Sequence, residues 1–241
     1  METTAKIQRF NVLAHDLRIT KLPGRDYSVY EKYNSACLLG NGSDFLTLLA
    51  RSRTGIPESL ILDIPDFRSS ALSEVLFEFN YRNSGGWDSL LKEYTDFLPQ
   101  TALKETIKSI NSFLREPADG FCSYIKNHTI IDLIGSGPGL TPAGDDYIIG
   151  ILNTSSFFTP LLFKELAGRI ASHINNTTSL SRNFIRLALE KRASEDIIKL
   201  LFSIAESSSE KIKKYTEKVA SFGETSGYYT LKGILWVLKK I

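Results

Sequence analysis

The sequence predicts an α+β protein in which a β-rich N-terminal region precedes a mostly helical C-terminal region. Residues 1–66 contain short runs with aromatic and β-branched residues, separated by turn signals such as Pro23-Gly24 and Gly40-Asn41-Gly42. After residue 67, apolar residues recur at spacings of three and four, which is typical of helices. We therefore expect a β-rich region over 1–66 and a helical region over 67–241.

Four runs predict the strands of the N-terminal region, and they cover residues 7–14, 27–39, 44–50 and 60–64. Short strands that follow one another closely through tight turns favour a small antiparallel sheet or barrel.

The helices of the C-terminal region are predicted from apolar spacing and from residues that start or stop helices. Pro160 suits a first helical turn, Ser194 precedes two acidic residues, and Gly223 stands where a helix often ends. The expected helices cover residues 87–97, 102–114, 145–158, 160–174, 178–191, 194–205, 209–222 and 226–239.

Composition excludes several classes of protein. A net charge of +2 gives no electrostatic case for nucleic-acid binding. No run approaches the ~18 apolar residues of a membrane span, and the start of the chain does not resemble a signal peptide. The two cysteines, Cys37 and Cys122, lie far apart, which argues against a disulfide framework or a cysteine-rich metal site. We expect a cytoplasmic protein with neither nucleic acid nor membrane as partner.

The most distinctive segment covers residues 135–146 and reads GSGPGLTPAGDD. It does not match the dinucleotide fingerprint, because its third glycine is misplaced. It is not a phosphate-binding P-loop either, since Asp145 and Asp146 stand where a lysine and a hydroxyl residue are required. Aspartates repel a phosphate group unless a cation lies between them.

This segment nevertheless has the features of a binding site at a helix start. The backbone amides of 135–139 could hold an anionic group near the positive end of the helix. Asp145 and Asp146 could accept hydrogen bonds from an amide or amine, or could bind Mg²⁺. The structural alternative is that one aspartate caps the helix and the other faces solvent.

Two further polar blocks, 175–182 and 223–227, also open expected helices. Hydroxyl groups and a guanidinium at a helix start suit a carboxylate or phosphate group, although simple capping or a plain turn would explain them too. We hypothesise that the three helix starts converge on one pocket. Its candidate catalytic residues are Asp145 and Asp146, and its candidate ligand-binding residues are Gly135, Gly137, Gly139, Thr141, Gly144, Thr178, Ser181, Arg182, Thr225, Ser226 and Gly227.

Chemistry through a covalent enzyme intermediate is poorly supported. None of the three histidines has a hydrolase-like or metal-ligand spacing, and Cys37 lies in an apolar run typical of a buried thiol. Any catalysis is therefore expected to proceed by orientation and charge stabilisation.

The segment 135–146 resembles the signature of a bacterial family marked by a GLTPxGDD motif. That family includes AllH, a subunit of oxamate carbamoyltransferase in anaerobic allantoin degradation. Residues 177–182 and 223–227 are similar to later polar blocks of the family, and 27–49 is similar in layout. The third block reads GETSGYYT, whereas relatives tend to have a histidine near its start, so no histidine-dependent role is carried over.

The resemblance implies work beside other subunits on carbamoyl phosphate, oxamate or oxalurate-like substrates. The first hypothesis is thus a subunit of a carbamoyltransferase of ureide catabolism that binds a small anionic or carbamoyl-bearing ligand. The alternative is a non-catalytic subunit that binds a metabolite or supports assembly, and a third is a purely structural partner. No cofactor is required by these hypotheses, and the aspartate pair suggests only Mg²⁺.

Overall fold

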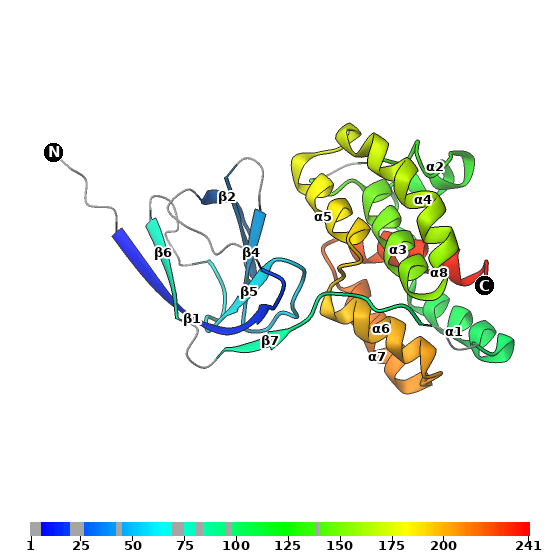
Figure 1. Cartoon of the computed structure of the whole chain (residues 1–241), viewed down its shortest axis with the longest axis horizontal. Helices are drawn as coiled ribbons and strands as arrows, with labels where there is room; N and C mark the ends of the chain where they lie inside the picture. Colours follow the sequence, from blue (N-terminus) through cyan, green and yellow to red (C-terminus); the bar gives the residue numbers. More distant parts are fainter. Residues whose placement is uncertain are drawn as a thin grey trace. The chain divides into compact units, whose positions relative to one another are not determined.

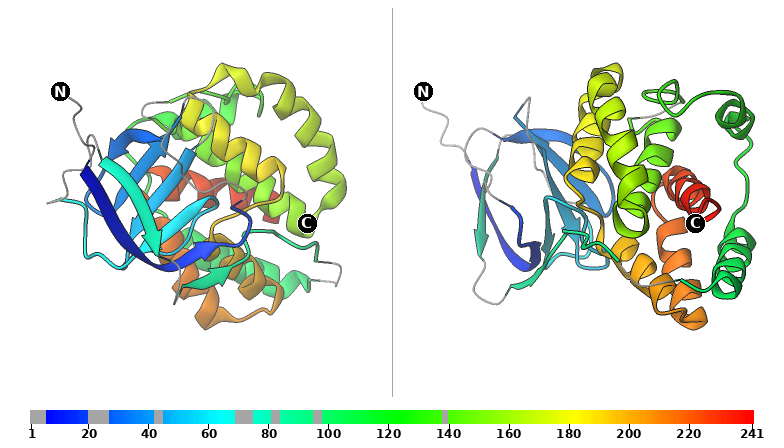
Figure 2. Two further views of the ribbon diagram at one scale, coloured as in Figure 1. Left: turned by 60° about the vertical axis from the view of Figure 1, so that its left-hand side comes forward. Right: turned by 45° about the vertical axis from the view of Figure 1, so that its right-hand side comes forward.

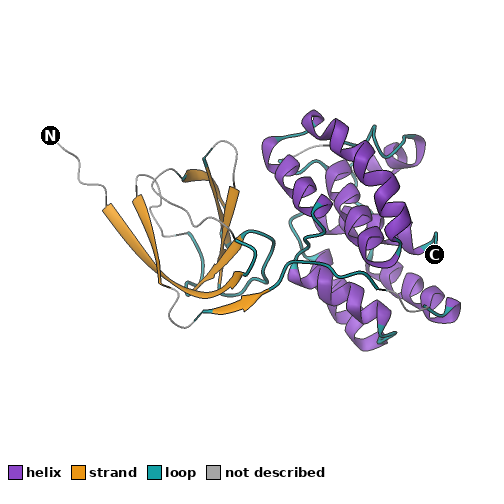
Figure 3. Cartoon of the chain, in the orientation of Figure 1, coloured by secondary structure: helices purple, strands orange, loops and turns teal. Residues whose placement is uncertain are grey.

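The computed structural model describes residues 6–19, 27–41, 45–68, 75–80, 84–94, 98–137 and 140–241. The chain divides into two compact units, residues 1–89 and 90–241. The described strands lie in the first unit and the described helices in the second (Figure 1, Figure 3). The predicted α+β class, with the β-rich region first, is confirmed.

The first unit is built on one curled sheet (Figure 1). Strand order is β2-β3-β4-β5-β1-β6, and β7 also pairs with β1. The pairs β4–β5, β1–β6 and β1–β7 are parallel, so the sheet is mixed, whereas the sequence predicted an antiparallel one. The strands are β1 (Lys6–Asp16), β2 (Ser28–Lys32), β3 (Ala36–Gly40), β4 (Phe45–Ala50), β5 (Ser59–Leu62), β6 (Val75–Asn80) and β7 (Gly85–Trp87).

Two differences from the expected strands have local causes. The run 27–39 is split into β2 and β3 by a tight turn, in which the Tyr33 amide donates to the Ala36 carbonyl at 2.8 Å. Strands β6 and β7 follow residue 66, and their parallel pairing with β1 depends on partners distant in sequence. Local patterns therefore could not reveal this pairing.

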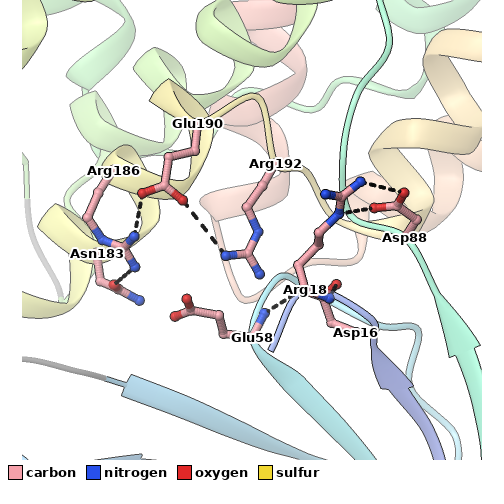
Figure 4. A network of polar contacts seen from close by, with 8 residues as sticks. All are labelled: Asp16, Arg18, Glu58, Asp88, Asn183, Arg186, Glu190 and Arg192. Carbon is pink, nitrogen blue, oxygen red and sulfur yellow. Dashed lines mark hydrogen bonds and ion pairs between the residues drawn. The ribbon is translucent and has the colours of Figure 1, made fainter. Parts of the chain in front are cut away.

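Buried apolar side chains hold this unit together, and a buried aspartate lies at the end of β1. The core includes Phe10, Leu39, Leu48, Leu60 and Phe67. Asp16 is fully buried, and its carboxylate accepts hydrogen bonds from the amides of Arg18 and Glu58, each at 3.0 Å. The Arg18 side chain pairs with Asp88 at 2.8 Å (Figure 4). These contacts fix the end of β1.

The second unit contains α1 (Gln100–Phe113), α2 (Phe121–Asn127), α3 (Ala143–Phe158), α4 (Pro160–His173), α5 (Ser179–Leu189), α6 (Glu195–Ala205), α7 (Ser209–Ala220) and α8 (Ser226–Leu238). A single 3₁₀ turn, Ile174–Asn176, links α4 to α5. Seven of the predicted helices are present with bounds shifted by a few residues. None of these helices combines the length and apolarity needed to cross a bilayer, in the part of the chain described.

The helix expected over 87–97 is wrong. Trp87 ends β7, and residues 88–94 contain no helical turn. The Leu91 amide donates to the Lys191 carbonyl at 2.7 Å, and the Tyr94 amide to the Phe157 carbonyl at 2.8 Å. Backbone groups of this segment therefore find partners in distant parts of the chain instead of in a helix of their own.

Helix α3 lies at the centre of the second unit and packs against α4, α5, α6 and α8 (Figure 2). Residues 143–157 of this helix are buried, except for the half-buried Ile149. A Cβ at Gly150 would lie 2.1 Å from the Thr230 carbonyl oxygen, and one at Gly233 would lie 2.1 Å from that of Tyr147. These two glycines allow the middle parts of α3 and α8 to pack closely.

Candidate functional site

The first turn of α3 carries both predicted catalytic aspartates, but they have different surroundings. Asp145 is fully buried. Its Oδ1 accepts a hydrogen bond from the Gly135 amide at 2.8 Å, and its Oδ2 accepts one from the Thr177 hydroxyl. Both carboxylate oxygens are therefore occupied within the chain. Through these two hydrogen bonds, Asp145 connects the loop before α3 and the turn before α5 to the first turn of α3.

Two glycines of the motif lie where nearby backbone leaves no room for a side chain. A Cβ at Gly135, where φ is +73°, would lie 2.2 Å from the Asn176 carbonyl oxygen. A Cβ at Gly144 would lie 2.0 Å from the Leu133 carbonyl oxygen. Gly137 also has a positive φ, +103°. The candidate Gly139 lies outside the described residues.

Two of the loop amides expected to hold an anion are already donors within the chain. The Gly135 amide donates to Asp145, and the Ser136 amide donates to the Leu133 carbonyl at 3.0 Å. The Gly144 amide in the first turn of α3 donates to the Ser136 carbonyl at 2.9 Å. These three amides are therefore occupied within the chain, and the hydroxyl and carboxyl side chains of the motif are further candidates for contacting a ligand.

The three polar blocks meet through direct hydrogen bonds. The Thr178 hydroxyl, at the start of α5, donates to the Leu140 carbonyl at 2.7 Å. The hydroxyl oxygens of Thr141 and Ser226 lie 3.2 Å apart, which joins the loop to the start of α8. The starts of α3, α5 and α8 are thus adjacent, as the convergence hypothesis requires.

Asp146 has a very different environment from its neighbour. The residue is 6 % exposed, and its Oδ2 is buried without a hydrogen-bond partner among the described residues. Burial raises the pKa of Asp146 to about 8; the nearby Ser226 hydroxyl lowers it and the Asp145 carboxylate raises it further. At neutral pH most molecules therefore carry a protonated Asp146, which can donate a hydrogen bond.

The start of α5 adds a second buried polar atom without a partner. Ser181 is fully buried, and its Oγ has no hydrogen-bond partner within the described part of the chain. Arg182 turns its Nη2 toward the carbonyl oxygens of Asn175 and Thr177, at 3.4 and 3.3 Å. Its buried Nε has no partner in the described ranges. Unsatisfied buried polar atoms are rare in native proteins and call for an explanation.

The remaining candidates, at the start of α8, are Thr225, Ser226 and Gly227. Thr225 precedes the first turn, and its side chain makes no capping hydrogen bond. Gly227 is buried, and a Cβ there would lie 2.1 Å from the Val219 carbonyl oxygen. Gly227 therefore allows α8 to pack on α7, and Ser226 is the side chain of this block that contacts the loop before α3.

The geometry does not fit a Mg²⁺ ion held by the aspartate pair. Both oxygens of Asp145 already accept hydrogen bonds, and a protonated Asp146 is a poor ligand for a cation. Among the described residues, no cluster of three or more histidine, cysteine or acidic side chains could hold a metal ion.

The tyrosines that follow the third block were not among the site residues predicted from the sequence. The Tyr229 hydroxyl lies 2.7 Å from both carboxylate oxygens of Asp119, and the Tyr228 hydroxyl lies 3.2 Å from Cys122 Sγ. Both contacts attach the short helix α2 to the start of α8. The adjacent tyrosines after Gly227 were the available signal, but their partners are more than a hundred residues away.

Other polar and hollow regions of this unit contain none of the predicted residues. In the last turn of α5, Arg186 donates to Asn183 at 2.8 Å and to Glu190 at 2.6 Å (Figure 4). A hollow of about 370 Å³ lies at the start of α4, with Phe163 and Lys191 among its lining residues. Lys191 is paired there with Glu93 at 2.7 Å.

Comparison with known proteins found a family model that matches the part of the chain containing these three blocks. Residues 133–238 match the family model described as oxamate carbamoyltransferase subunit AllH. Searches among curated proteins and among solved structures gave no match. The matched region runs from the loop before α3 to the last residue of α8, so it includes all three polar blocks. The resemblance read from the GLTPxGDD motif is thus confirmed over residues 133–238, the part of the chain that matches the model of the oxamate carbamoyltransferase subunit AllH.

Proposed function

We propose that the chain is a subunit of a carbamoyltransferase of oxamate and ureide catabolism. It binds a small anionic or carbamoyl-bearing ligand where the starts of α3, α5 and α8 meet. The observation that carries this proposal is the pair of buried polar atoms, Asp146 Oδ2 and Ser181 Oγ, that lack a partner among the described residues at this junction. A ligand would supply the missing hydrogen bonds.

The chemistry of the junction suits such a ligand. Three helix starts direct the positive ends of their dipoles toward it, which favours a negative charge. Hydroxyl groups of Thr141, Ser181 and Ser226 can donate to an oxygen or accept from an amide. Carbamoyl transfer requires an anion to be held and an amide to be oriented, and both can proceed without a covalent enzyme intermediate.

The match to the family model supports work beside other subunits of oxamate carbamoyltransferase. We propose carbamoyl phosphate, oxamate or a related ureide as the ligand, and the cytoplasm as the compartment. The two free, buried cysteines, Cys37 and Cys122, are compatible with a reducing compartment.

Thermal unfolding of the purified full chain tests this site. Oxamate, carbamoyl phosphate, inorganic phosphate and Mg²⁺ are each added to wild type, to Ser226→Ala and to the control Ser221→Ala, an exposed serine before α8. A ligand at a hundred times its Kd adds about 2.7 kcal/mol. We expect one of the anions to raise the midpoint by roughly 5 °C in wild type and control, and by much less in Ser226→Ala. Equal shifts in all three proteins would contradict the site.

A non-catalytic binding subunit is the second candidate. It is favoured by the structural use of Asp145, whose occupied oxygens leave Asp146 as the one acidic side chain of the motif able to meet a ligand. Turnover by the enzyme reassembled from all its subunits separates the two hypotheses. A catalytic subunit loses turnover in Asp146→Leu even at saturating substrate, whereas a binding subunit keeps it.

A further inference from the structure

The proposed function does not determine how Asp146 meets the ligand. A carboxylate would accept from an amide or bind a cation, whereas a carboxylic acid would donate to an oxygen. Resting on that proposed function, we infer that Asp146 presents its protonated carboxyl group and donates a hydrogen bond to a carboxylate or carbonyl oxygen of the ligand. The site therefore selects small molecules with exposed acceptor oxygens and disfavours cations.

The first argument is geometric. Asp146 Oδ2 is buried and has no hydrogen-bond partner in the part of the chain described, so the protein supplies no donor to an anion at that atom. A buried carboxylate without a partner is far more costly than a buried acid. Asp145, which precedes it, has a donor at each of its carboxylate oxygens, from Gly135 and Thr177.

The second argument is the balance of charge around Asp146. The Asp145 carboxylate disfavours a second negative charge beside it, and burial acts in the same direction. The Ser226 hydroxyl favours the charged form, but its effect is smaller than that of burial. The charged or titratable groups on the neighbouring elements are Lys164, Glu165, Arg169 and His173 on α4, Arg182 and Arg186 on α5, Glu195, Asp196 and Lys199 on α6, and Tyr228, Tyr229 and Lys232 on α8, with Glu224 just before α8.

These neighbouring groups have other partners or are exposed. Arg182 turns its Nη2 to the carbonyl oxygens of Asn175 and Thr177. Asp196 lies 3.6 Å from the Lys218 ammonium, and Lys232 lies over the Tyr228 ring. His173 and Glu224 are exposed. The balance at Asp146 thus raises its pKa to about 8, which supports the protonated form at neutral pH.

The hydroxyl groups of the junction complete the recognition of such a ligand. Ser181 Oγ is buried and has no partner among the described residues, and it can donate or accept. Thr141 and Ser226 form a hydroxyl pair that can do the same. A hydrogen bond from a carboxylic acid to a carboxylate is short and strong. Oxamate has both a carboxylate and an amide, so it matches a set of one acid and several hydroxyls.

Calorimetric titration of oxamate into the full chain between pH 6 and pH 10 tests the inference. Oxamate keeps one charge over this range, so any change in affinity comes from the protein. We expect the Kd for wild type to increase by up to about tenfold per pH unit once Asp146 ionises above pH 8. Asp146→Asn keeps a donor and cannot ionise, so it should bind at pH 7 with a Kd that is independent of pH. Glu165→Gln, an exposed acid on α4, should behave as wild type.

Three outcomes would overturn the inference. One is a wild-type Kd for oxamate that stays constant up to pH 10. Another is loss of oxamate binding at pH 7 in a folded Asp146→Asn variant, which would show that a charged carboxylate is needed. In both cases wild type still binds oxamate and the proposed function stands. The third outcome, no oxamate binding to wild type at any pH, would contradict the inference and the proposed site together.

Discussion

Asp145 and Asp146 are adjacent in the chain but have opposite roles, because consecutive helix residues project about 100° apart. Asp145 accepts two hydrogen bonds, and an asparagine would leave one buried donor unsatisfied. We expect Asp145→Asn to lower the free energy of unfolding by about 2–3 kcal/mol at pH 7. Asp146→Asn should not lower it, since the folded wild-type group is already neutral and the variant removes the ionisation that stabilises the unfolded chain. Urea denaturation measures both, and equal losses would contradict the assignment.

The raised pKa of Asp146 also predicts how stability depends on pH. The folded chain keeps a proton up to about pH 8, whereas the unfolded chain releases it near the ordinary value of 3.8. Between these values the native state binds more protons, so its stability falls as pH rises, by at most about 1.4 kcal/mol per unit. The contribution is complete below about pH 4 and is lost above about pH 8.

Asp146→Asn is the matched reference for this pH dependence. The free energy of unfolding of wild type, minus that of the variant, should fall between pH 5 and pH 8 and then level off. Parallel curves for the two proteins in urea denaturation would show that Asp146 ionises normally in the folded chain.

Glycines in the helices of this unit differ in whether their surroundings have room for a side chain. A Cβ at Gly144 would meet the Leu133 carbonyl oxygen at 2.0 Å, whereas a Cβ at Gly168, on exposed α4, would meet nothing within 4 Å. We expect Gly144→Ala to destabilise the chain by about 1–3 kcal/mol. Gly168→Ala should stabilise it by up to about 1 kcal/mol through better helix propensity. Thermal and urea unfolding measure both variants, and a loss in Gly168→Ala as large as that in Gly144→Ala would contradict this distinction.

The same elements show how far the sequence could predict the fold. Helices with strong periodicity and clear caps, such as 194–205 with Ser194 accepting from the Ile197 amide, were predicted to within a few residues. The segment 87–97 was not, because its backbone pairs with Lys191 and Phe157. The parallel strands β6 and β7 were missed for a similar reason, since their partner β1 is about seventy residues away.

For the candidate site, the sequence predicted that three polar blocks would meet, and hydrogen bonds do join the loop before α3 to the starts of α5 and α8. Residue types and helix-start signals are local, so Thr141, Thr178 and Ser226 could be chosen before their contacts were known. The different roles of Asp145 and Asp146 could not be predicted. It depends on the Gly135 amide and the Thr177 hydroxyl reaching Asp145, and those contacts exist only in the folded chain.

At the scale of the whole molecule, the two units have separate cores. The apolar cluster of the first unit lies within residues 10–67, and those of the second lie within 91–241. Since no cluster in the described residues draws from both units, we expect residues 90–241 to fold cooperatively when expressed alone. Circular dichroism with thermal unfolding checks this. A fragment without a cooperative transition would show that the helical unit depends on the first.

The central claim is that the starts of α3, α5 and α8 form one site for a small anion. Amide chemical-shift mapping of the full chain during titration with oxamate tests it most directly. The account predicts that the largest shifts cluster at residues 140–146, 177–182 and 225–228, while residues 160–167 in the hollow at α4 stay unchanged. Shifts that centre on that hollow, or no shifts at saturating oxamate, would contradict the account.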